Sequence, residues 1–328
     1  MKKPIVLSDR KVVCSNAEAA LLELGDGIAC VQFLSKGNSI TPSVREFLLE
    51  LVSDDLKGFD GLVIGTQGKN FSVGANLTTM KEGIDNKDFA AFEKRVRAFQ
   101  QMTMAIKYSK KPIVAAPYGM TLGGGLEVVL HTSARAALNK SFMGLVEVGV
   151  GLIPGGGGTK ESALLVGNAA PDKREEIMKA VFRKLLTRTV TKSAEDALEK
   201  RYLEPGDLIV TAREPLIAWA KTLCLELLEA GYVPGEAASV TLPGKTGYDT
   251  LCAYAGELLE AGEITPYDVE IGRKLARVLT GGETADEAAC TERQLLDLEC
   301  LGFLELVQTP GTYERISHFL QTNTLLRK

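Results

Sequence analysis

Residues 111–160 read KPIVAAPYGMTLGGGLEVVLHTSARAALNKSFMGLVEVGVGLIPGGGGTK, and this stretch predicts a strand, a glycine turn and a helix in direct succession. Ile113 to Ala116 form an apolar run of the length of a short buried strand. The glycines Gly123 to Gly125 let the backbone approach a partner that a side chain would exclude. A helix is expected from about Leu126. Its N-terminus would present unpaired N–H groups, which stabilise an anion or a developing oxyanion.

Two glutamates in this stretch have apolar, glycine-rich surroundings. Glu127 opens the expected helix, and Glu147 lies shortly before the second glycine run, Gly155 to Gly158. A surface carboxylate is the ordinary interpretation of either residue in a chain with 42 acidic side chains. Burial, however, raises a carboxyl pKa, and two carboxyls near one water push their pKa values apart. One would then hold a proton while the other is ionised, which suits general acid–base catalysis.

Three motifs together resemble the enoyl-CoA hydratase/isomerase (crotonase) superfamily in order and spacing. They are NFSVGANL at 70–77, LGGGLE at 122–127 and GLVEVGVGLIPGGGGTK at 144–160. The resemblance covers roughly Ala19 to Leu228. The residues beyond resemble the tail of bacterial β-oxidation proteins that fuse a 3-hydroxyacyl-CoA dehydrogenase to a hydratase.

The resemblance assigns roles to particular residues. The backbone N–H groups of Ala75 and Gly124 would form the oxyanion hole that holds the thioester oxygen. Glu147 would donate a proton to Cα, and Glu127 would orient and deprotonate the water. Substrate-binding positions would be Gly74, Asn76, Gly123 and Gly125. Because Asn76 stands where many relatives have Asp, its side chain is assigned no role.

Two further assignments stay open at this stage. His131, four residues after Glu127, either hydrogen-bonds that carboxylate or is an ordinary packing residue. Lysines at 69, 81 and 160 are weak candidates for contacting CoA phosphates, because surface lysines are common.

The implied function is enoyl-CoA hydratase: syn addition of water to a trans-2-enoyl-CoA, giving a 3-hydroxyacyl-CoA in fatty-acid β-oxidation. The presence of both glutamates favours a hydratase over an isomerase, which can work with a single glutamate near the second position. The alternatives are an enoyl-CoA isomerase, another acyl-CoA lyase or hydrolase on the same fold, and an inactive acyl-CoA-binding scaffold. CoA enters as part of the acyl-CoA thioester substrate, so no separate cofactor is expected. A homotrimer or hexamer that works with a 3-hydroxyacyl-CoA dehydrogenase is the expected assembly.

Composition narrows the class of protein. With a formal charge of −4, the chain lacks the basic excess typical of nucleic-acid binders. Its six cysteines form no CxxC pair and it has only two histidines, so no metal site is expected. Scattered cysteines, no signal-peptide pattern and no long apolar run indicate a cytoplasmic protein that does not span a membrane. No glycine cluster fits the dinucleotide-binding pattern G-x-G-x-x-G.

The pattern along the chain predicts an α/β crotonase (ClpP/crotonase-like) spiral of ββα units with an α-helical C-terminal extension. A hairpin is expected around Gly25-Asp26-Gly27, and a long amphipathic helix over Asp88–Ser109. A boundary is expected in the glycine- and proline-rich segment 231–247, with helices only after it. The predicted division is 1–18, an N-terminal tail or remnant; 19–232, the crotonase-like acyl-CoA domain; and 233–328, the helical extension.

Overall fold

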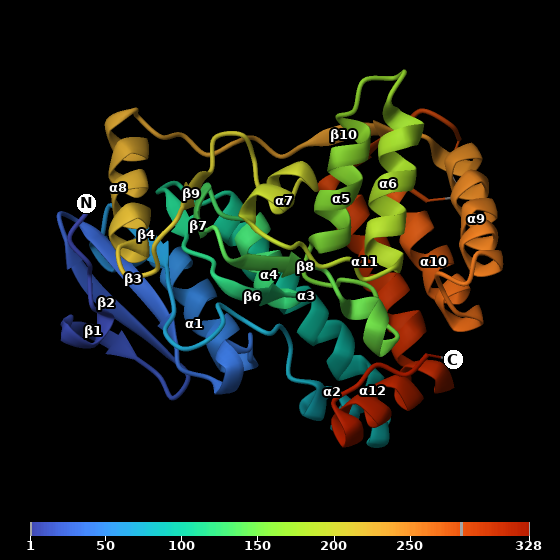
Figure 1. The fold of residues 1–328 in the computed structure, drawn as a ribbon, viewed down its shortest axis with the longest axis horizontal. Helices are drawn as coiled ribbons and strands as arrows, with labels where there is room; N and C mark the ends of the chain where they lie inside the picture. The colour runs from blue at the N-terminus through green and yellow to red at the C-terminus, as the bar shows by residue number, and fades with distance from the viewer. Residues whose placement is uncertain (1, 283–284, 328) are drawn as a thin grey trace. The chain divides into compact units, whose positions relative to one another are not determined.

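The structure, a computed structural model, describes residues 2–282 and 285–327, which divide into two compact units of interleaved segments (Figure 1). Unit 1 comprises Met1–Asn76, Gln101–Gly144 and Val190–Glu236. Unit 2 comprises Leu77–Gln100, Leu145–Thr189 and Ala237–Lys328. The C-terminal segment therefore shares one compact unit with two earlier parts of the chain.

Unit 1 is built on a seven-stranded sheet in the order β1-β2-β3-β4-β5-β7-β9. The first three strands pair antiparallel and the pairs from β3 onward are parallel. The strands are β1 (Val12–Ser15), β2 (Ala19–Gly25), β3 (Ile28–Phe33), β4 (Gly61–Ile64), β5 (Ile113–Ala115), β7 (Ala134–Leu138) and β9 (Leu208–Val210). Every residue of β4, β5 and β7 is buried, as is usual for parallel strands covered on both faces.

The predicted hairpin is confirmed, since β2 and β3 pair around Gly25, Asp26 and Gly27, all of which have positive φ. The segment expected to be an N-terminal tail contains a strand, because β1 pairs antiparallel with β2. This strand has only four residues and no buried side chain, so its sequence shows no clear alternation that would reveal it.

A second, two-stranded parallel sheet of unit 1 leads directly to the glycine turn. It joins β6 (Gly119–Leu122) to β8 (Ser141–Gly144), with Leu122 opposite Gly144. Helix α4 (Gly124–Leu130) follows β6 and begins two residues before the predicted start. The other helices of unit 1 are α1 (Pro42–Ser53), α7 (Ala194–Glu199) and α8 (Leu216–Glu229), together with the 3-10 turns η1 (Leu7–Asp9), η2 (Lys36–Asn38) and η3 (Asp55–Gly58).

Unit 2 is mainly helical. Its helices are α2 (Leu77–Asp85), α5 (Gly158–Gly167), α6 (Arg174–Leu186), α9 (Gly244–Glu260), α10 (Pro266–Leu279), α11 (Glu292–Val307) and α12 (Pro310–Thr322), with the 3-10 turn η4 (Glu147–Val150). Helix α3 (Phe89–Lys107), the predicted long amphipathic helix, begins in unit 2 and ends in unit 1. None of the described helices is both long enough and apolar enough to cross a membrane.

The expectation of helices only in the C-terminal segment is wrong. Strands β10 (Ser239–Leu242) and β11 (Ala288–Thr291) pair antiparallel, although 45 residues separate their facing ends Leu242 and Ala288. Each strand has four residues, and their pairing partner is distant in sequence. Local periodicity therefore gave no signal for either.

Candidate active site

Two loops of unit 1 that both carry predicted site residues are in direct contact. Gly74 has φ +90°, and a Cβ built on it would lie 3.0 Å from the Leu122 carbonyl oxygen and 3.4 Å from the Gly124 nitrogen. Gly125 is equally close to the other loop, since its Cβ would lie 2.4 Å from Cβ of Ser72. Glycine is therefore required at both positions, because any larger residue would push the two loops apart.

The packing of the two loops leaves the backbone N–H groups of Ala75 and Gly124 without a hydrogen-bond acceptor among the described residues. Gly124 is the first residue of α4, whose N-terminal N–H groups have no acceptor inside the helix. Its neighbour Gly123 differs, because its N–H donates to the Gly144 carbonyl at 2.9 Å. Two donors without an acceptor on contacting loops are what the predicted oxyanion hole requires.

Glu127 lies in the first turns of α4 and is buried at 2% exposure, with the apolar neighbours Leu126 and Val128 fully buried. Its backbone N–H donates to the Gly123 carbonyl at 2.9 Å, which ties the glutamate to the glycine turn. The Nδ1 atom of His131 is 2.6 Å from the Glu127 carbonyl oxygen. The helix backbone, rather than the carboxylate, is thus the partner identified for this atom of the histidine.

A buried arginine fixes the opposite end of the same helix. Arg135 donates from Nε to the Val129 carbonyl at 3.1 Å and from Nη2 to the Leu130 carbonyl at 2.8 Å. Asp207 holds this arginine in turn, because its Oδ1 accepts the Arg135 backbone N–H at 2.8 Å and its Oδ2 lies 3.5 Å from Nη1. A cation at a helix C-terminus is favourable, and these contacts fix the helix that carries Glu127.

Glu147 lies in unit 2, as the first residue of η4. The residue as a whole is half-buried, but its Oε2 atom is buried and has no hydrogen-bond partner among the described residues. Burial raises the pKa of the Glu147 carboxyl to about 7, and the nearby charge of Glu299 acts in the same direction. Such a carboxyl can hold a proton near neutral pH and release it.

Glu299 is a second buried carboxyl of unit 2, and the sequence analysis missed it. It projects from α11 to the start of α5, where its two oxygens accept the backbone N–H groups of Gly157, Thr159 and Lys160 at 2.7–3.0 Å. Gln100 also donates to it at 3.2 Å. Burial raises its pKa to about 7, although these hydrogen bonds oppose that shift. Only its apolar neighbours in sequence hinted at burial.

Lys160 cannot contact a CoA phosphate, so this weak prediction is wrong. Its side chain is fully buried, and Nζ forms ion pairs with Glu161 and with Glu292, the latter at 2.9 Å. Its pKa is raised: burial works against the charged form, but the two carboxylates more than offset it. Lys160 is therefore an internal cation of unit 2.

The predicted site residues thus fall into two sets. Unit 1 brings together the two loops and the start of α4, which carry Gly74, Ala75, Asn76, Gly123, Gly124, Gly125 and Glu127. Unit 2 holds Glu147 on a short turn. Gly125 packs against Ser72, so its role is to let the loops approach; a substrate contact at this position stays a prediction. Ala75 and Asn76 are exposed residues.

Comparisons with known proteins agree with these motifs. Residues 39–168 match the family model described as enoyl-CoA hydratase/isomerase. The chain is 38% identical over 316 residues to a probable 3-hydroxyacyl-CoA dehydrogenase of Bacillus subtilis (strain 168), an alignment that covers 96% of this chain and 40% of that protein. It is 28% identical over 183 residues to a short-chain-enoyl-CoA hydratase of Clostridium acetobutylicum, covering 54% of this chain and 64% of that protein. The chain thus spans less than two thirds of either relative.

A solved structure supplies the comparison of folds. The crystal structure of enoyl-CoA hydratase from Bacillus halodurans matches with a TM-score of 0.62 at 17% identity, covering 92% of this chain and 99% of that one. This similarity confirms the predicted α/β crotonase fold with its C-terminal helices. With its three motifs in place, the chain resembles the enoyl-CoA hydratase/isomerase (crotonase) superfamily, whose family model it matches over residues 39–168, and it resembles one part of longer fused proteins.

Proposed function

We propose that the chain is an enoyl-CoA hydratase, a hydro-lyase that adds water to a trans-2-enoyl-CoA. The observation that carries this proposal is the pair of unused N–H groups at Ala75 and Gly124, on loops that Gly74 brings into contact. Attack at Cβ of an enoyl thioester moves negative charge onto the thioester oxygen. Two preorganised donors stabilise that charge, and losing one such donor typically costs about 3 kcal/mol.

The two glutamates supply the proton transfers in this proposal. Glu127 accepts a proton from water as the water oxygen bonds to Cβ, and the C=C π electrons move toward the thioester to give an enolate. Glu147 then donates its proton to Cα, which returns the electrons and restores the thioester carbonyl. One proton passing from Glu127 back to Glu147 through solvent resets the pair, so the net reaction consumes one water.

The state of Glu147 supports its role as the acid. A carboxyl with a pKa of about 7 is roughly half protonated at neutral pH, whereas one with the usual pKa of about 4 would be almost fully ionised. An acid–base group is most effective when its pKa lies near the operating pH. The name of the Clostridium relative, a short-chain-enoyl-CoA hydratase, supports the same reaction.

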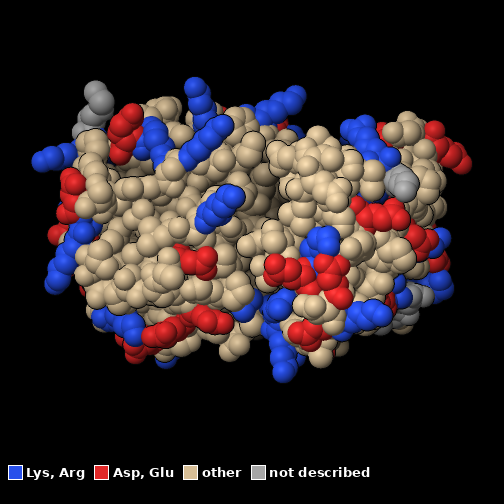
Figure 2. Space-filling view, turned by 90° about the horizontal axis from the view of Figure 1, so that it is seen from below, with Lys and Arg blue, Asp and Glu red and all other residues tan. Residues whose placement is uncertain are grey.

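Recognition of the substrate is proposed to depend on local donors rather than on a general positive field. The chain has a net charge of −4, and acidic and basic side chains are interspersed on the face shown in Figure 2. An acyl-CoA is itself polyanionic, so the field of the protein's net negative charge would repel it weakly. CoA is proposed to enter only as part of the substrate. A homotrimer or hexamer in the cytoplasm, acting beside a 3-hydroxyacyl-CoA dehydrogenase, remains the proposed setting.

The test is turnover of crotonyl-CoA, followed by the loss of its conjugated absorbance. We expect hydration with the purified chain. Isomerisation of a 3-enoyl-CoA without hydration of the 2-enoyl-CoA would indicate the isomerase, for which a single proton-transfer group such as Glu147 suffices. Acyl-CoA binding with neither reaction would indicate the scaffold and overturn the proposal.

A second expectation separates the chain from its dehydrogenase-named relative. The chain should form no NADH from a 3-hydroxyacyl-CoA and NAD, because no glycine cluster in it fits G-x-G-x-x-G. The measurement is absorbance at the NADH band with the purified chain. A rate proportional to protein concentration would show a nicotinamide site that the sequence does not reveal.

A further inference from the structure

The turn that carries Glu147 is held from outside by helix α12. We call residues 147–151 the Glu147 turn. Thr312 donates from Oγ1 to the Gly151 carbonyl at 2.6 Å, and Arg315 donates from Nη1 to the Val148 carbonyl at 2.8 Å. Gly151 has φ +88°, and a Cβ on it would lie 2.6 Å from Cα of Thr312. At Gly151 the backbone of the Glu147 turn therefore packs directly against the backbone of α12.

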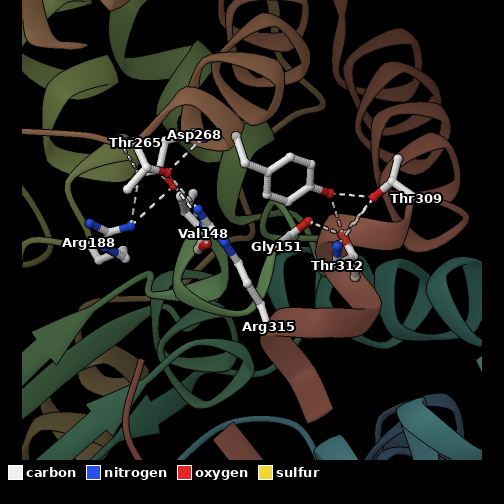
Figure 3. A network of polar contacts seen from close by, with 9 residues as sticks. Val148, Gly151, Arg188, Thr265, Asp268, Thr309, Thr312 and Arg315 are labelled. Carbon is white, nitrogen blue, oxygen red and sulfur yellow. Dashed lines mark hydrogen bonds and ion pairs between the residues drawn. The ribbon is translucent and has the colours of Figure 1, made fainter. Parts of the chain in front are cut away.

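Figure 3 shows that both donors are themselves fixed within unit 2. Arg315 is 2% exposed in its side chain and contacts the fully buried Asp268 at 2.7 Å, and it also donates to Thr265 Oγ1 at 2.9 Å. Arg188 reaches the same aspartate at 3.2 Å. The Thr312 hydroxyl lies 2.8 Å from the Tyr267 hydroxyl, which also bonds to Thr309.

Such a network is costly unless complete, because each buried charge must find partners. Asp268 has several: it takes part in the capping box that starts α10, and it pairs with both Arg315 and Arg188. The arginine can therefore remain buried with one N–H directed at a neutral carbonyl. The buried guanidinium of Arg315 thus donates a hydrogen bond to the backbone carbonyl of Val148, the residue after Glu147.

We propose that Thr312 and Arg315 are positioning residues, which fix the backbone of the Glu147 turn and thereby aim the Glu147 carboxyl. This inference rests on the proposed function, in which Glu147 is the proton donor. Neither residue is assigned contact with the substrate. They act through two carbonyls of the turn.

The carboxyl depends on its turn for a simple reason. Its Oε2 atom has no hydrogen-bond partner among the described residues, and the backbone N–H groups of Val146 and Glu147 itself hydrogen-bond the carboxyl, so the local backbone sets its direction. A misplacement of about 1 Å in a catalytic group can cost roughly 10²-fold in rate. A loosened turn would also admit water and thereby remove the burial that favours the protonated carboxyl.

The charged groups around the turn come from four segments of unit 2. Arg315 approaches from α12 and Asp268 from α10. Glu299 of α11 acts on Glu147 through its charge, and Arg188 Cδ would be 3.3 Å from a Cβ on Gly149. Replacing Thr312 by a neutral residue changes none of these charges. Any change in the titration of Glu147 would then reflect the position of its turn.

The decisive variant is therefore Thr312→Val, with Thr280→Val as its matched control. Both threonines are fully buried in unit 2, and each hydroxyl donates to a backbone carbonyl, at 2.6 Å to Gly151 and at 2.8 Å to Ala276. We expect the first variant to lower kcat about 10- to 100-fold with little change in KM. The control should lose similar thermal stability and keep its kcat. Thr312→Ser restores the hydroxyl and should recover most of the rate.

A titration that does not depend on turnover separates this inference from the proposed function. The carboxyl of Glu147 is followed by ¹³C NMR in glutamate-labelled protein, with Glu147→Gln identifying its signal. We expect its pKa to fall in Thr312→Val and to stay unchanged in Thr280→Val. Unchanged kcat and titration in Thr312→Val would overturn the positioning role while leaving the hydratase proposal intact. If the protein hydrates nothing, a shifted titration would still support the turn's dependence on α12.

Arg315→Lys gives a second, independent variant if Thr312→Val fails to fold. Lysine keeps the charge opposite Asp268 but cannot serve Val148, Asp268 and Thr265 together, because it lacks the forked guanidinium. The expected result is again a lower kcat and a lower Glu147 pKa. A variant of wild-type kcat and wild-type titration would contradict the inference for Arg315.

Discussion

Glu147→Gln is expected to lower the turnover number for crotonyl-CoA by roughly 10²–10⁴-fold, about 3–5 kcal/mol in the activation barrier. Glutamine keeps the size and most of the hydrogen-bonding capacity of glutamate but cannot release a proton near neutral pH. KM should change little, because the proposed oxyanion hole consists of the Ala75 and Gly124 N–H groups. Hydration at the wild-type rate would refute the mechanism.

Glu127→Gln should also lower the rate of hydration, because the water would lose its base. It could spare the shift of a double bond, which needs no water. The double variant should lose less than the sum of the two single losses, since both groups act on the same bound substrate within one catalytic cycle and their effects are not independent. A matched control is Glu176→Gln, on the exposed surface of α6, which should behave as the wild type. Rates on 2-enoyl and 3-enoyl thioesters separate these effects.

The rate of hydration should decrease at high pH, because the mechanism requires a protonated acid. Glu147 is active when protonated, and its pKa is raised to about 7. kcat/KM for hydration should therefore fall as the pH rises above about 7, and this alkaline limb should disappear in Glu147→Gln. A profile that is flat from pH 6 to pH 9 would contradict the assignment of Glu147 as the acid.

A chain that ends at Glu236 is expected to be insoluble or aggregated. It lacks β10 and all of α9 to α12, which belong to the same compact unit as α5 and α6. Phe182 and Leu186 would lose their cover by α10, which approaches them so closely at Gly272 that a Cβ there would lie 3.2 Å from Phe182, and Lys160 would lose Glu292. Each buried large apolar side chain contributes about 1.5–3 kcal/mol, against a net stability of about 5–15 kcal/mol for a domain. The truncated chain cannot absorb such a loss.

Soluble yield, light scattering and thermal unfolding measure this outcome. The control is a chain that ends at Leu326, which keeps every helix of unit 2 and should have the wild-type mass and melting temperature. A soluble, fully active chain ending at Glu236 would show that residues 237–328 form an independent module. The interleaved composition of unit 2 argues against that result.

The site residues that could be predicted are those whose residue type is itself informative, such as a glycine where the backbone geometry allows no side chain. Gly74 has to be glycine because of its φ and its approach to Leu122 and Gly124, and a glycine is visible in any sequence. Glu127 and Glu147 stood out through their apolar neighbours. Their roles, however, came from the family resemblance.

The residues that could not be predicted act over long separations in sequence. Glu299 accepts N–H groups about 140 positions earlier, and Arg315 donates to a carbonyl 167 positions earlier. In the sequence both are ordinary charged residues of amphipathic helices, for which a solvated surface is the usual place. Only the packing of α10, α11 and α12 within unit 2 makes them buried. Strands β10 and β11 escaped prediction for the same reason.

The contact between Glu299 and the start of α5 has a consequence for where phosphate groups can be bound. In many nucleotide-binding proteins a glycine-rich turn offers the N–H groups of a helix terminus to a phosphate. Here the turn at 155–158 leads to such a terminus, but the carboxylate of Glu299 already takes the N–H groups of Gly157, Thr159 and Lys160. The Glu299 carboxylate thus occupies the position that a bound anion would take, and the N-terminus of α5 has no free N–H groups at these three residues for a phosphate. The turn at 123–125 has a similar composition and keeps the Gly124 donor available.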